Sequence, residues 1–343
     1  MSAYTNAQFF RLVIDMPVTA KDIALELRLS QPTVSRILSG VPGHRVAEAT
    51  RTRVEDTARR MGYQPNAVAR SLREGRTHII GLYTNHDYDA RNEFLGTIIG
   101  SLQRGCEEQE LDLLLHSARF DSSPETMFGK LRDGRIDGLI LHANADDPLV
   151  PLLGESTLPV VAIADSVPGL PSVTCDDADG MHQIITSLWE RGYRKFVFLA
   201  PNQPLTSVVR RRMAFEAEIA RHKVAAEDWA ILSIVGEEAG ERLSDILKFG
   251  LRPAVVCWND RTAYALLRAC QANQVRVPED LAVTGFDGFP DDKIPAWRIV
   301  TVRCPWASVA AAALDVLIKR IGGSPGPETE TCLPVSLVLG NTA

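Results

Sequence analysis

Residues 18–40 read VTAKDIALELRLSQPTVSRILSG, and this stretch predicts two short helices that meet across a tight turn. Thr19 is placed to cap the first helix, with Asp22 three residues later as in a capping box. Ser30 is a second N-cap residue, Pro32 lies in the first turn that follows, and Gly40 comes after the helix. Apolar residues at helical spacing follow each cap, so the two helices can share a small core.

Residues 45–82 continue as RVAEATRTRVEDTARRMGYQPNAVARSLREGRTHIIGL. Val54, Ala58 and Met61 lie on one face of a predicted third helix, and Gly62 ends it. Three short helices of this kind form either a helix-turn-helix or a structural helical hairpin with incidental polar residues. The helical pattern alone leaves both interpretations open.

In a helix-turn-helix the second helix enters the major groove, and its early exposed side chains reach the base edges. Arg36 is suited to a bidentate contact with guanine and Gln31 to adenine, while Thr33 and Ser35 suit phosphate or methyl contacts. Pro32 is exposed at the same end of the helix. These residues are the candidate base readers of the first interpretation.

The charge is distributed unevenly along the chain. The 343 residues carry 37 Lys and Arg against 43 Asp and Glu, yet residues 1–78 alone carry 12 Lys and Arg against 7 Asp and Glu. A basic N-terminal module on an acidic body is typical of a protein whose first segment meets phosphates. The apolar runs are too short to span a membrane and the first 16 residues lack an export signal, so we expect a cytoplasmic protein.

The two quoted segments together resemble the LacI/GalR family of bacterial repressors, and a weaker similarity continues to about residue 339. The resemblance implies that residues 66–72 form a hinge helix that folds on operator DNA, with Leu72 wedged between base pairs. A segment this short is a marginal helix by itself, and a leucine wedge can kink a duplex. Packing of Leu72 against the body is the alternative. The residues expected to contact DNA are Thr19, Lys21, Gln31, Pro32, Thr33, Ser35, Arg36, Asn66, Ala69 and Leu72.

The N-terminal part of the sequence departs from the family pattern at three places. Arg28 occupies the turn position where the family usually has Gly, and a left-handed backbone there costs a non-Gly residue about 1 kcal/mol. Ala47 replaces the usual polar cap of the third helix. Residues 1–15 have no counterpart in the family, so we expect either that translation begins at Met16 or that this extension is disordered.

Beyond residue 78, apolar runs alternate with helical stretches, as in a doubly wound parallel sheet. The predicted strands are residues 79–83, 111–116, 138–142, 160–165, 196–200, 255–258 and 281–287. The resemblance implies an α/β body of the type I periplasmic-binding-protein plan, with two lobes, three crossovers and a ligand between the lobes. The glycine- and proline-rich residues 322–327 would lie near the last crossing.

The expected domains follow from this plan. They are an extension (1–16), an all-α helix-turn-helix head (17–63), a hinge and linker (64–76), and a body (77–343) for effector binding and dimerisation. The first lobe would comprise about 77–176 plus 303–322, and the second about 177–300 plus 328–343.

Ligands in open α/β sheets bind beyond the carboxyl ends of the strands. The polar residues that end the predicted strands are His142, Asp165, Asp176, Asp177, Asn259, Asp260 and Asp287. For any single Asp among them, a helix cap or a turn is an equal alternative. Several carboxylates beside an aromatic ring suit a polyhydroxylated ligand. The resemblance implies that Val256 faces the ligand, and Trp258, two residues later on the same face, would supply the ring, although core packing would explain it too.

The family resemblance extends the candidate ligand site. It matches RRRMAF to an Arg-x-x-Gly-Phe motif, which makes Arg211 the ligand-binding arginine, although Arg210 and Arg212 leave this assignment uncertain by one position. Ala214 replaces the glycine of that motif. The complete expected set is Asn92, Phe94, His142, Asp165, Arg211, Trp258, Asn259, Asp260 and Asp287.

Two other classes of protein were weighed against a regulator. An enzyme is disfavoured because no GxGxxG, P-loop or GxSxG motif follows a strand, and because the seven His residues show no metal spacing. Asp176 and Asp177 could serve as the acid and the base of an enzyme, but they are adjacent, so on an extended segment their side chains point to opposite faces. A transport binding protein would need an export signal and no helix-turn-helix. We therefore expect a ligand-switched repressor of carbohydrate or polyol genes that binds a palindromic operator as a homodimer, without metal or cofactor.

Overall fold

The computed structural model describes residues 18–39, 46–85, 92–117, 123–203, 205–235, 238–290, 296–324 and 330–343. The chain divides into two compact units, Met1–Thr77 and His78–Ala343, which are described separately below. The predicted extension 1–16 lies outside the described residues. In the ranges given, no helix has the length and apolar character that a membrane span requires.

The first unit contains the three predicted helices, α1 (Ala20–Leu27), α2 (Gln31–Leu38) and α3 (Glu48–Met61). The capping box at α1 is confirmed: Thr19 Oγ1 accepts from the Asp22 backbone N–H, and the Asp22 carboxylate accepts from the Thr19 N–H at 2.8 Å. Ser30 caps α2 as expected. Ile23, Val34 and Val54, one from each helix, are completely buried and form the centre of a small separate core.

Two of the departures from the family pattern affect helix ends in this head. Arg28 ends α1 in the left-handed region at φ 53°, the strained geometry expected there. Ala47 precedes α3 with no side-chain hydrogen bond to the helix, so the first turn of α3 lacks one stabilising contact. Gly62 ends α3 in the left-handed region, which costs glycine little.

The predicted hinge segment forms a fourth helix, α4 (Ala67–Glu74). Asn66 caps it, since its Oδ1 accepts from the backbone N–H groups of Val68 and Ala69. No residue of α4 is buried. The helix is held by its cap, its own backbone bonds and a hydrogen bond that Arg73 donates to the Ser39 hydroxyl at 2.7 Å.

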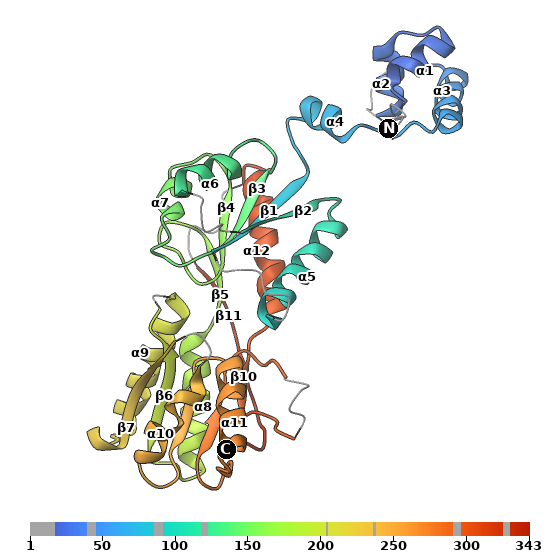
Figure 1. Ribbon diagram of the computed structural model, residues 1–343. Helices are drawn as coiled ribbons and strands as arrows, with labels where there is room; N and C mark the ends of the chain where they lie inside the picture. The colour runs from blue at the N-terminus through green and yellow to red at the C-terminus, as the bar shows by residue number, and fades with distance from the viewer. Residues whose placement is uncertain are drawn as a thin grey trace, which may run out of the picture. The chain divides into compact units, whose positions relative to one another are not determined.

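The second unit is an α/β body whose two larger sheets contain only parallel strand pairs, which confirms the predicted fold class (Figure 1). The first sheet has the order β11-β5-β4-β3-β1-β2, the second the order β7-β6-β8-β9, and β10 pairs antiparallel with β12. The strands are β1 (Ile79–Thr84), β2 (Asp112–Ser117), β3 (Gly138–His142), β4 (Val160–Ala164), β5 (Ser172–Cys175), β6 (Phe196–Pro201), β7 (Trp229–Ile234), β8 (Ala254–Cys257), β9 (Ala282–Thr284), β10 (Thr301–Arg303), β11 (Thr331–Leu333) and β12 (Ser336–Val338).

Helices cover the sheets and complete each lobe. Helix α12 lies beside α5 and packs on β3, β4 and β5 of the first sheet, although it follows the second lobe in sequence. The helices of the body are α5 (Glu93–Glu108), α6 (Pro124–Leu131), α7 (Leu149–Gly154), α8 (Asp177–Glu190), α9 (Thr206–Arg221), α10 (Leu243–Lys248), α11 (Asp260–Ala272) and α12 (Trp306–Ile321), with 3-10 turns η1 (Ala226–Asp228) and η2 (Ala239–Arg242).

All seven predicted strands of the body are present, with ends shifted by up to three residues. Five further strands were not predicted. Strand β7 is apolar except at Ser233 but has mostly half-buried side chains, while β5, β10, β11 and β12 have only three or four residues each. Periodicity is a weak signal for such short or edge strands.

The chain passes between the lobes three times, as expected, but the last passage differs from the prediction. Residues 331–333 were assigned to the second lobe, whereas β11 pairs with β5 of the first sheet, with Leu333 opposite Cys175. The last crossing is therefore the step from β11 to β12, and not the glycine-rich segment 322–327, of which residues 325–327 lie outside the described residues. Backbone pairing, which no local sequence signal reported, decided this boundary.

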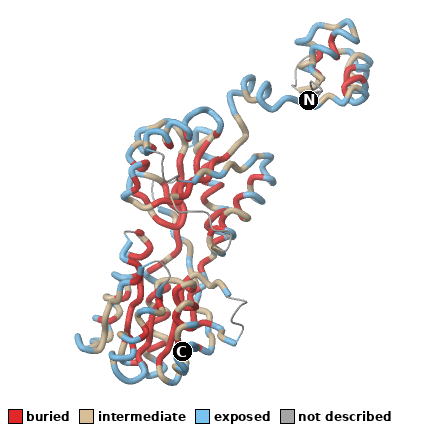
Figure 2. Tube along the Cα trace, in the orientation of Figure 1, coloured by how far each residue is buried: buried red, intermediate tan, exposed pale blue. Residues whose placement is uncertain are grey.

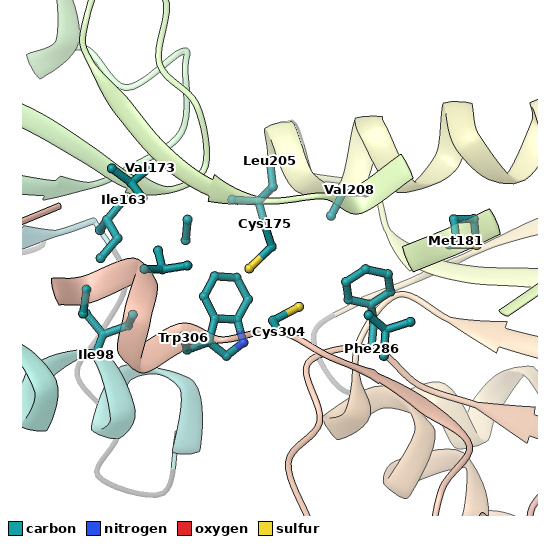
Figure 3. Packing of buried hydrophobic residues seen from close by; sticks show 14 of the residues in the cluster. Ile98, Ile163, Val173, Cys175, Met181, Leu205, Val208, Phe286, Cys304 and Trp306 are labelled. Atoms are coloured by element: carbon teal, nitrogen blue, oxygen red, sulfur yellow. The ribbon is translucent and has the colours of Figure 1, made fainter. Parts of the chain in front are cut away.

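One hydrophobic core runs through the junction of the lobes. Buried residues follow the strands of both lobes in Figure 2. Ile163 and Val173 of the first sheet belong to the same cluster as Met181 and Phe286 of the second lobe, with Trp306 and two cysteines of the crossing segments between them (Figure 3). The crossings are thus packed segments and not loose linkers.

Candidate functional site

Helix α2 presents the predicted base-reading residues on its solvent side. Gln31, Pro32 and Arg36 are exposed, and Thr33 and Ser35 are half-buried, while Val34 and Ile37 face the core. Thr19 and Lys21 are exposed at the start of α1. Thr19 also caps α1, so its hydroxyl is already engaged with Asp22. The face opposite the core is therefore free to approach a duplex.

The hinge helix leaves large apolar side chains in solvent. Leu72 is 82% exposed and Val68 is 68% exposed. Ala69 is exposed as well, and the Asn66 side chain is occupied as the helix cap. Leu72 does not belong to the small core of its own unit. Two exposed apolar side chains on one short helix indicate a contact surface.

A cavity of about 240 Å³ lies at the carboxyl ends of the strands of both lobes. Eight of the nine predicted ligand residues line it: Asn92, Phe94, His142, Asp165, Arg211, Trp258, Asn259 and Asp287. The lining includes further residues that were not predicted, among them Glu93, Ser207, Arg261, Phe289 and Trp306. The cavity is small and lined by both apolar and polar groups, which suits one small molecule.

Arg211 is the buried centre of the polar wall. Its Nε donates to Asp177 at 2.7 Å, its Nη1 donates to the Trp258 carbonyl, and its Nη2 lies 3.6 Å from Asp287. The guanidinium carbon lies 3.7 Å from the centroid of the Phe286 ring. The neighbouring side chains of Arg210 and Arg212 are partly exposed, at 36% and 58%. Burial thus selects Arg211 among the three consecutive arginines.

Two of the predicted carboxylates reach the cavity from opposite lobes. The Asp165 carboxylate follows β4 and accepts from the Ser207 backbone N–H of α9 at 2.7 Å, so it caps a helix of the other lobe. Asp287 lies at φ 118° and Ala164 at φ 71°, both in the left-handed region. Strained backbone of this kind is common at binding sites, where the surrounding structure holds it in place. Burial raises the pKa of Asp287 to about 7, an effect that Arg211 opposes.

Asp260 does not line the cavity, which corrects its predicted role. One carboxylate oxygen accepts from the backbone N–H groups of Gly288 and Phe289 at 2.7 Å each, and the other accepts from the Thr301 hydroxyl at 2.6 Å. Burial raises the pKa of Asp260 well above its usual range, and the nearby Asp287 adds to this. Because both oxygens are engaged, Asp260 orders the backbone immediately after Asp287. Its side chain is bonded to Thr301 and to the backbone, and it is not among the residues that line the cavity.

Two glycines leave space for the Asp260 carboxylate and for the Phe286 ring. A Cβ at Gly285 would lie 2.1 Å from Asp260 Oδ1. A Cβ at Gly180 would lie 2.5 Å from the Phe286 ring, on which Arg211 stacks. Both positions require glycine because of close approach and not because of backbone angle.

Several predicted polar residues also cap helices, which the sequence had left open only for the aspartates. Asn92 Oδ1 accepts from the Leu95 N–H, and Asn259 Oδ1 accepts from the Thr262 N–H. Each asparagine therefore lines the cavity while its oxygen is engaged at a helix start. Asp176 caps α8, and the buried Asp177 pairs with Arg211; neither lines the cavity.

Aromatic rings line the cavity from both lobes. Phe94 lies edge-on to Trp306 at a centroid distance of 4.8 Å and is tilted against His142 at 5.2 Å. Trp258 and Phe289 come from the second lobe. The indole N–H groups of Trp258 and Trp306 are buried with no hydrogen-bond partner among the described residues. Trp306 was missed from the sequence because it begins α12 after a lobe crossing, where no strand-end rule applies.

Comparison with known proteins shows which protein families this chain resembles. A model described as "Bacterial regulatory proteins, lacI family" matches residues 19–66, and one described as "Periplasmic binding protein-like domain" matches residues 185–343. The transcriptional regulator RegA of Clostridium saccharobutylicum is 28% identical over 314 residues, which cover 89% of this chain and 93% of that protein. The chain belongs to the LacI/GalR family of transcriptional regulators.

Other members extend the match over almost the full length. The catabolite control protein A of Staphylococcus epidermidis is 26% identical over 330 residues, which cover 93% of this LacI-family chain and 97% of that protein. The crystal structure of the Lac repressor dimer bound to operator and an anti-inducer matches with a TM-score of 0.82 and 22% identity, covering 95% of this chain and 99% of that one. At this identity the structural match supports the fold. The relatives named here are transcriptional regulators and not enzymes.

Proposed function

We propose that this regulator represses carbohydrate or polyol genes from the cytoplasm, binding a palindromic operator as a homodimer, and that a small polyhydroxylated ligand in the cavity switches it. The observation that carries the ligand class is the cavity itself, where three carboxylates, two arginines and aromatic rings from both lobes surround one small space. No catalytic step is part of the proposal. In the described ranges, no group of three or more His, Cys, Asp or Glu could hold a metal ion.

The chemistry of the cavity favours a polyol over an apolar ligand. Carboxylates such as Asp165 and Asp287 accept paired hydroxyl hydrogen bonds, and ring faces such as that of Trp258 cover sugar C–H groups. The two unpartnered indole N–H groups are donors that a hydroxyl oxygen can satisfy. A structure described as a complex of the regulator CelR with cellobiose has the same fold, at a TM-score of 0.68 and 23% identity.

The DNA-binding proposal uses the exposed faces of α2 and α4. Arg36 and Gln31 would read base edges, and Leu72 would enter a base step in the minor groove. One recognition helix reads only a half-site, so two heads related by a two-fold axis are needed for a palindrome. Ligand binding would change lobe closure, alter the spacing of the paired first lobes, and so favour or disfavour folded hinge helices on DNA.

Two measurements on the full-length protein test this function. Thermal unfolding is recorded with a panel of sugars, polyols and nucleobases, and operator binding is measured by fluorescence anisotropy with genomic palindromes at several salt concentrations. We expect one or more polyols to raise the unfolding temperature and to change the affinity for one palindrome. A response to purines alone would overturn the polyol class. Equal affinity for every palindrome and for random DNA would overturn specific operator binding.

A further inference from the structure

Two consecutive arginines of α9 serve the two lobes differently. Arg211 points into the cavity, whereas Arg210 reaches the first lobe, where both carboxylate oxygens of Glu330 accept from its guanidinium, one of them at 2.6 Å. We infer that Arg210 and Glu330 form an interlobe clasp that holds the lobes closed and thereby sets how strongly the regulator responds to its ligand. The effect on ligand response rests on the proposed function, whereas the effect on lobe closure does not.

Arg210 bonds to two residues of the first lobe, Glu330 and Ser166, and Glu330 is held in turn by Thr174. The Nη2 of Arg210 donates to the Ser166 hydroxyl at 2.9 Å, just after β4. Glu330 precedes β11 and accepts from the Thr174 hydroxyl on β5. Because β11, β5 and β4 are neighbours in one sheet, the clasp ties helix α9 of the second lobe to a rigid edge of the first.

The clasp lies next to two other bonds between the lobes. The Thr206 hydroxyl donates to the Ser166 carbonyl at 3.0 Å, and the Ser207 N–H donates to the Asp165 carboxylate, which lines the cavity. All of these donors lie in the first turns of α9. A movement that opens the lobes along this edge must break them together, so the clasp and the cavity wall depend on the same closure.

The charges of the clasp stabilise each other. Hydrogen bonding to Arg210 lowers the pKa of Glu330, and the same contact raises the pKa of Arg210. A bidentate arginine–carboxylate pair is among the stronger side-chain contacts. The side chains of Arg210 and Glu330 are 36% and 28% exposed, so salt should weaken the pair in part.

Closure links the clasp to the ligand. A ligand that contacts both lobes binds the closed form better, and its apparent affinity depends on how often that form is populated. A clasp that raises this population increases affinity without touching the ligand. Weakening the clasp should therefore lower affinity while leaving every cavity side chain in place.

The Ser207 amide reports closure directly. It lies in the first turn of α9, where a helix supplies no acceptor of its own, and its partner is on the other lobe. Hydrogen exchange at this amide in the ligand-free, full-length protein therefore measures opening of the lobes. The Leu149 amide is the matched reference, because it donates to the Asp147 carboxylate within the first lobe.

The variants are Arg210→Met, Glu330→Gln and the double variant, with Arg212→Met as the control. Arg212 is on the same helix but pairs with Glu216 on α9 itself. We expect Ser207 exchange to accelerate roughly 3- to 10-fold in both single variants, with no further change in the double variant, and Leu149 exchange to stay constant. In wild type, higher salt should accelerate Ser207 exchange in the same direction.

Two outcomes would overturn the clasp: Ser207 exchange that matches wild type in both single variants, or equal acceleration at Leu149, which would indicate general destabilisation. The sugar and polyol panel separates this inference from the proposed function. If Ser207 exchange responds as expected but no panel compound shifts the unfolding temperature of wild type, the clasp stands and the ligand class fails. If a compound binds wild type and Arg210→Met with equal affinity, the clasp does not control the response.

Discussion

The Nε of Arg211 donates to Asp177 at 2.7 Å, and both side chains are almost fully buried, at 3% and 4% exposed. This pair fixes the guanidinium at the floor of the cavity while leaving it 3.6 Å from Asp287. Burial raises the pKa of Asp177 above its usual range, and Arg211 opposes that shift. The positive charge that faces a ligand is thus held by an acid outside the cavity.

Replacing Arg211 tests this dependence. Arg211→Met should abolish the ligand-induced shift in unfolding temperature and lower stability by about 3–5 kcal/mol, because Asp177 would remain buried without its partner. Unfolding by urea with and without ligand measures both effects. Arg212→Met is the control, since that pair is largely exposed and should change stability by less than about 1 kcal/mol. Ligand binding that survives in Arg211→Met would contradict the assignment.

Asp287 predicts a pH dependence of ligand affinity near neutrality. Its pKa of about 7 lies above the ordinary 3.8, so the folded protein holds this proton longer than the unfolded chain. The contribution of this group to stability therefore falls as the pH rises from about 4 to about 7, and is constant above that. A polyol whose hydroxyls donate to the ionised carboxylate should bind up to about tenfold more tightly at pH 8 than at pH 6.

Titration calorimetry at pH 6, 7 and 8 measures this effect. Asp287→Asn is the matched variant, because it keeps the shape and removes the titrating group. We expect its affinity to be lower and nearly independent of pH. An equally steep pH dependence in Asp287→Asn would assign the titration to another group.

Replacing Gly285 tests how closely the Asp260 carboxylate packs against this position. In Gly285→Ala the new Cβ would lie 2.1 Å from Asp260 Oδ1, so the carboxylate has to move and lose contacts to Thr301 or to the backbone after Asp287. We expect a loss of stability of about 2–4 kcal/mol and weaker ligand binding. Gly154→Ala, with open space around its Cβ, is the control. Unchanged stability in Gly285→Ala would refute this packing.

The exposed Leu72 side chain predicts that its replacement weakens specific DNA binding more than nonspecific binding. Because its side chain is 82% exposed, Leu72→Ala should leave the unfolding temperature unchanged. Loss of the wedge should weaken operator binding roughly tenfold or more, with little change for random DNA. Anisotropy titrations with both DNAs provide the comparison. Equal losses on the two DNAs would reject the wedge.

The missing side-chain cap at Ala47 predicts that a polar residue there would stabilise the head. The first turn of α3 has no side-chain cap, so Ala47→Ser should slow amide exchange in α3 by an amount that corresponds to about 1 kcal/mol. Ala49→Ser, one residue inside the helix, is the comparison and should not stabilise it. No slowing in Ala47→Ser would mean that this helix start is limited by something other than its cap.

The sequence predicted the parts of this protein whose signals are local. The Thr19 and Ser30 caps and the left-handed turn at Arg28 each depend on residues within a few positions, and the structure has them as expected. Long apolar strands such as β3 were also predicted, because burial on both faces leaves a continuous run. Eight of the residues that line the cavity were predicted from the strand-end rule together with the family resemblance.

Only the tertiary structure decided which neighbouring side chains serve the cavity. Asp260 and Asp287 have equally suggestive motifs, yet Asp260 accepts hydrogen bonds from the backbone and Asp287 lines the cavity, because the direction of each carboxylate depends on bonds to distant residues. Trp306 and β11 joined their neighbours through lobe crossings that leave no periodic trace. The division between Arg210 and Arg211 required the fold as well, since two adjacent identical residues differ only in what the packed lobes place around them.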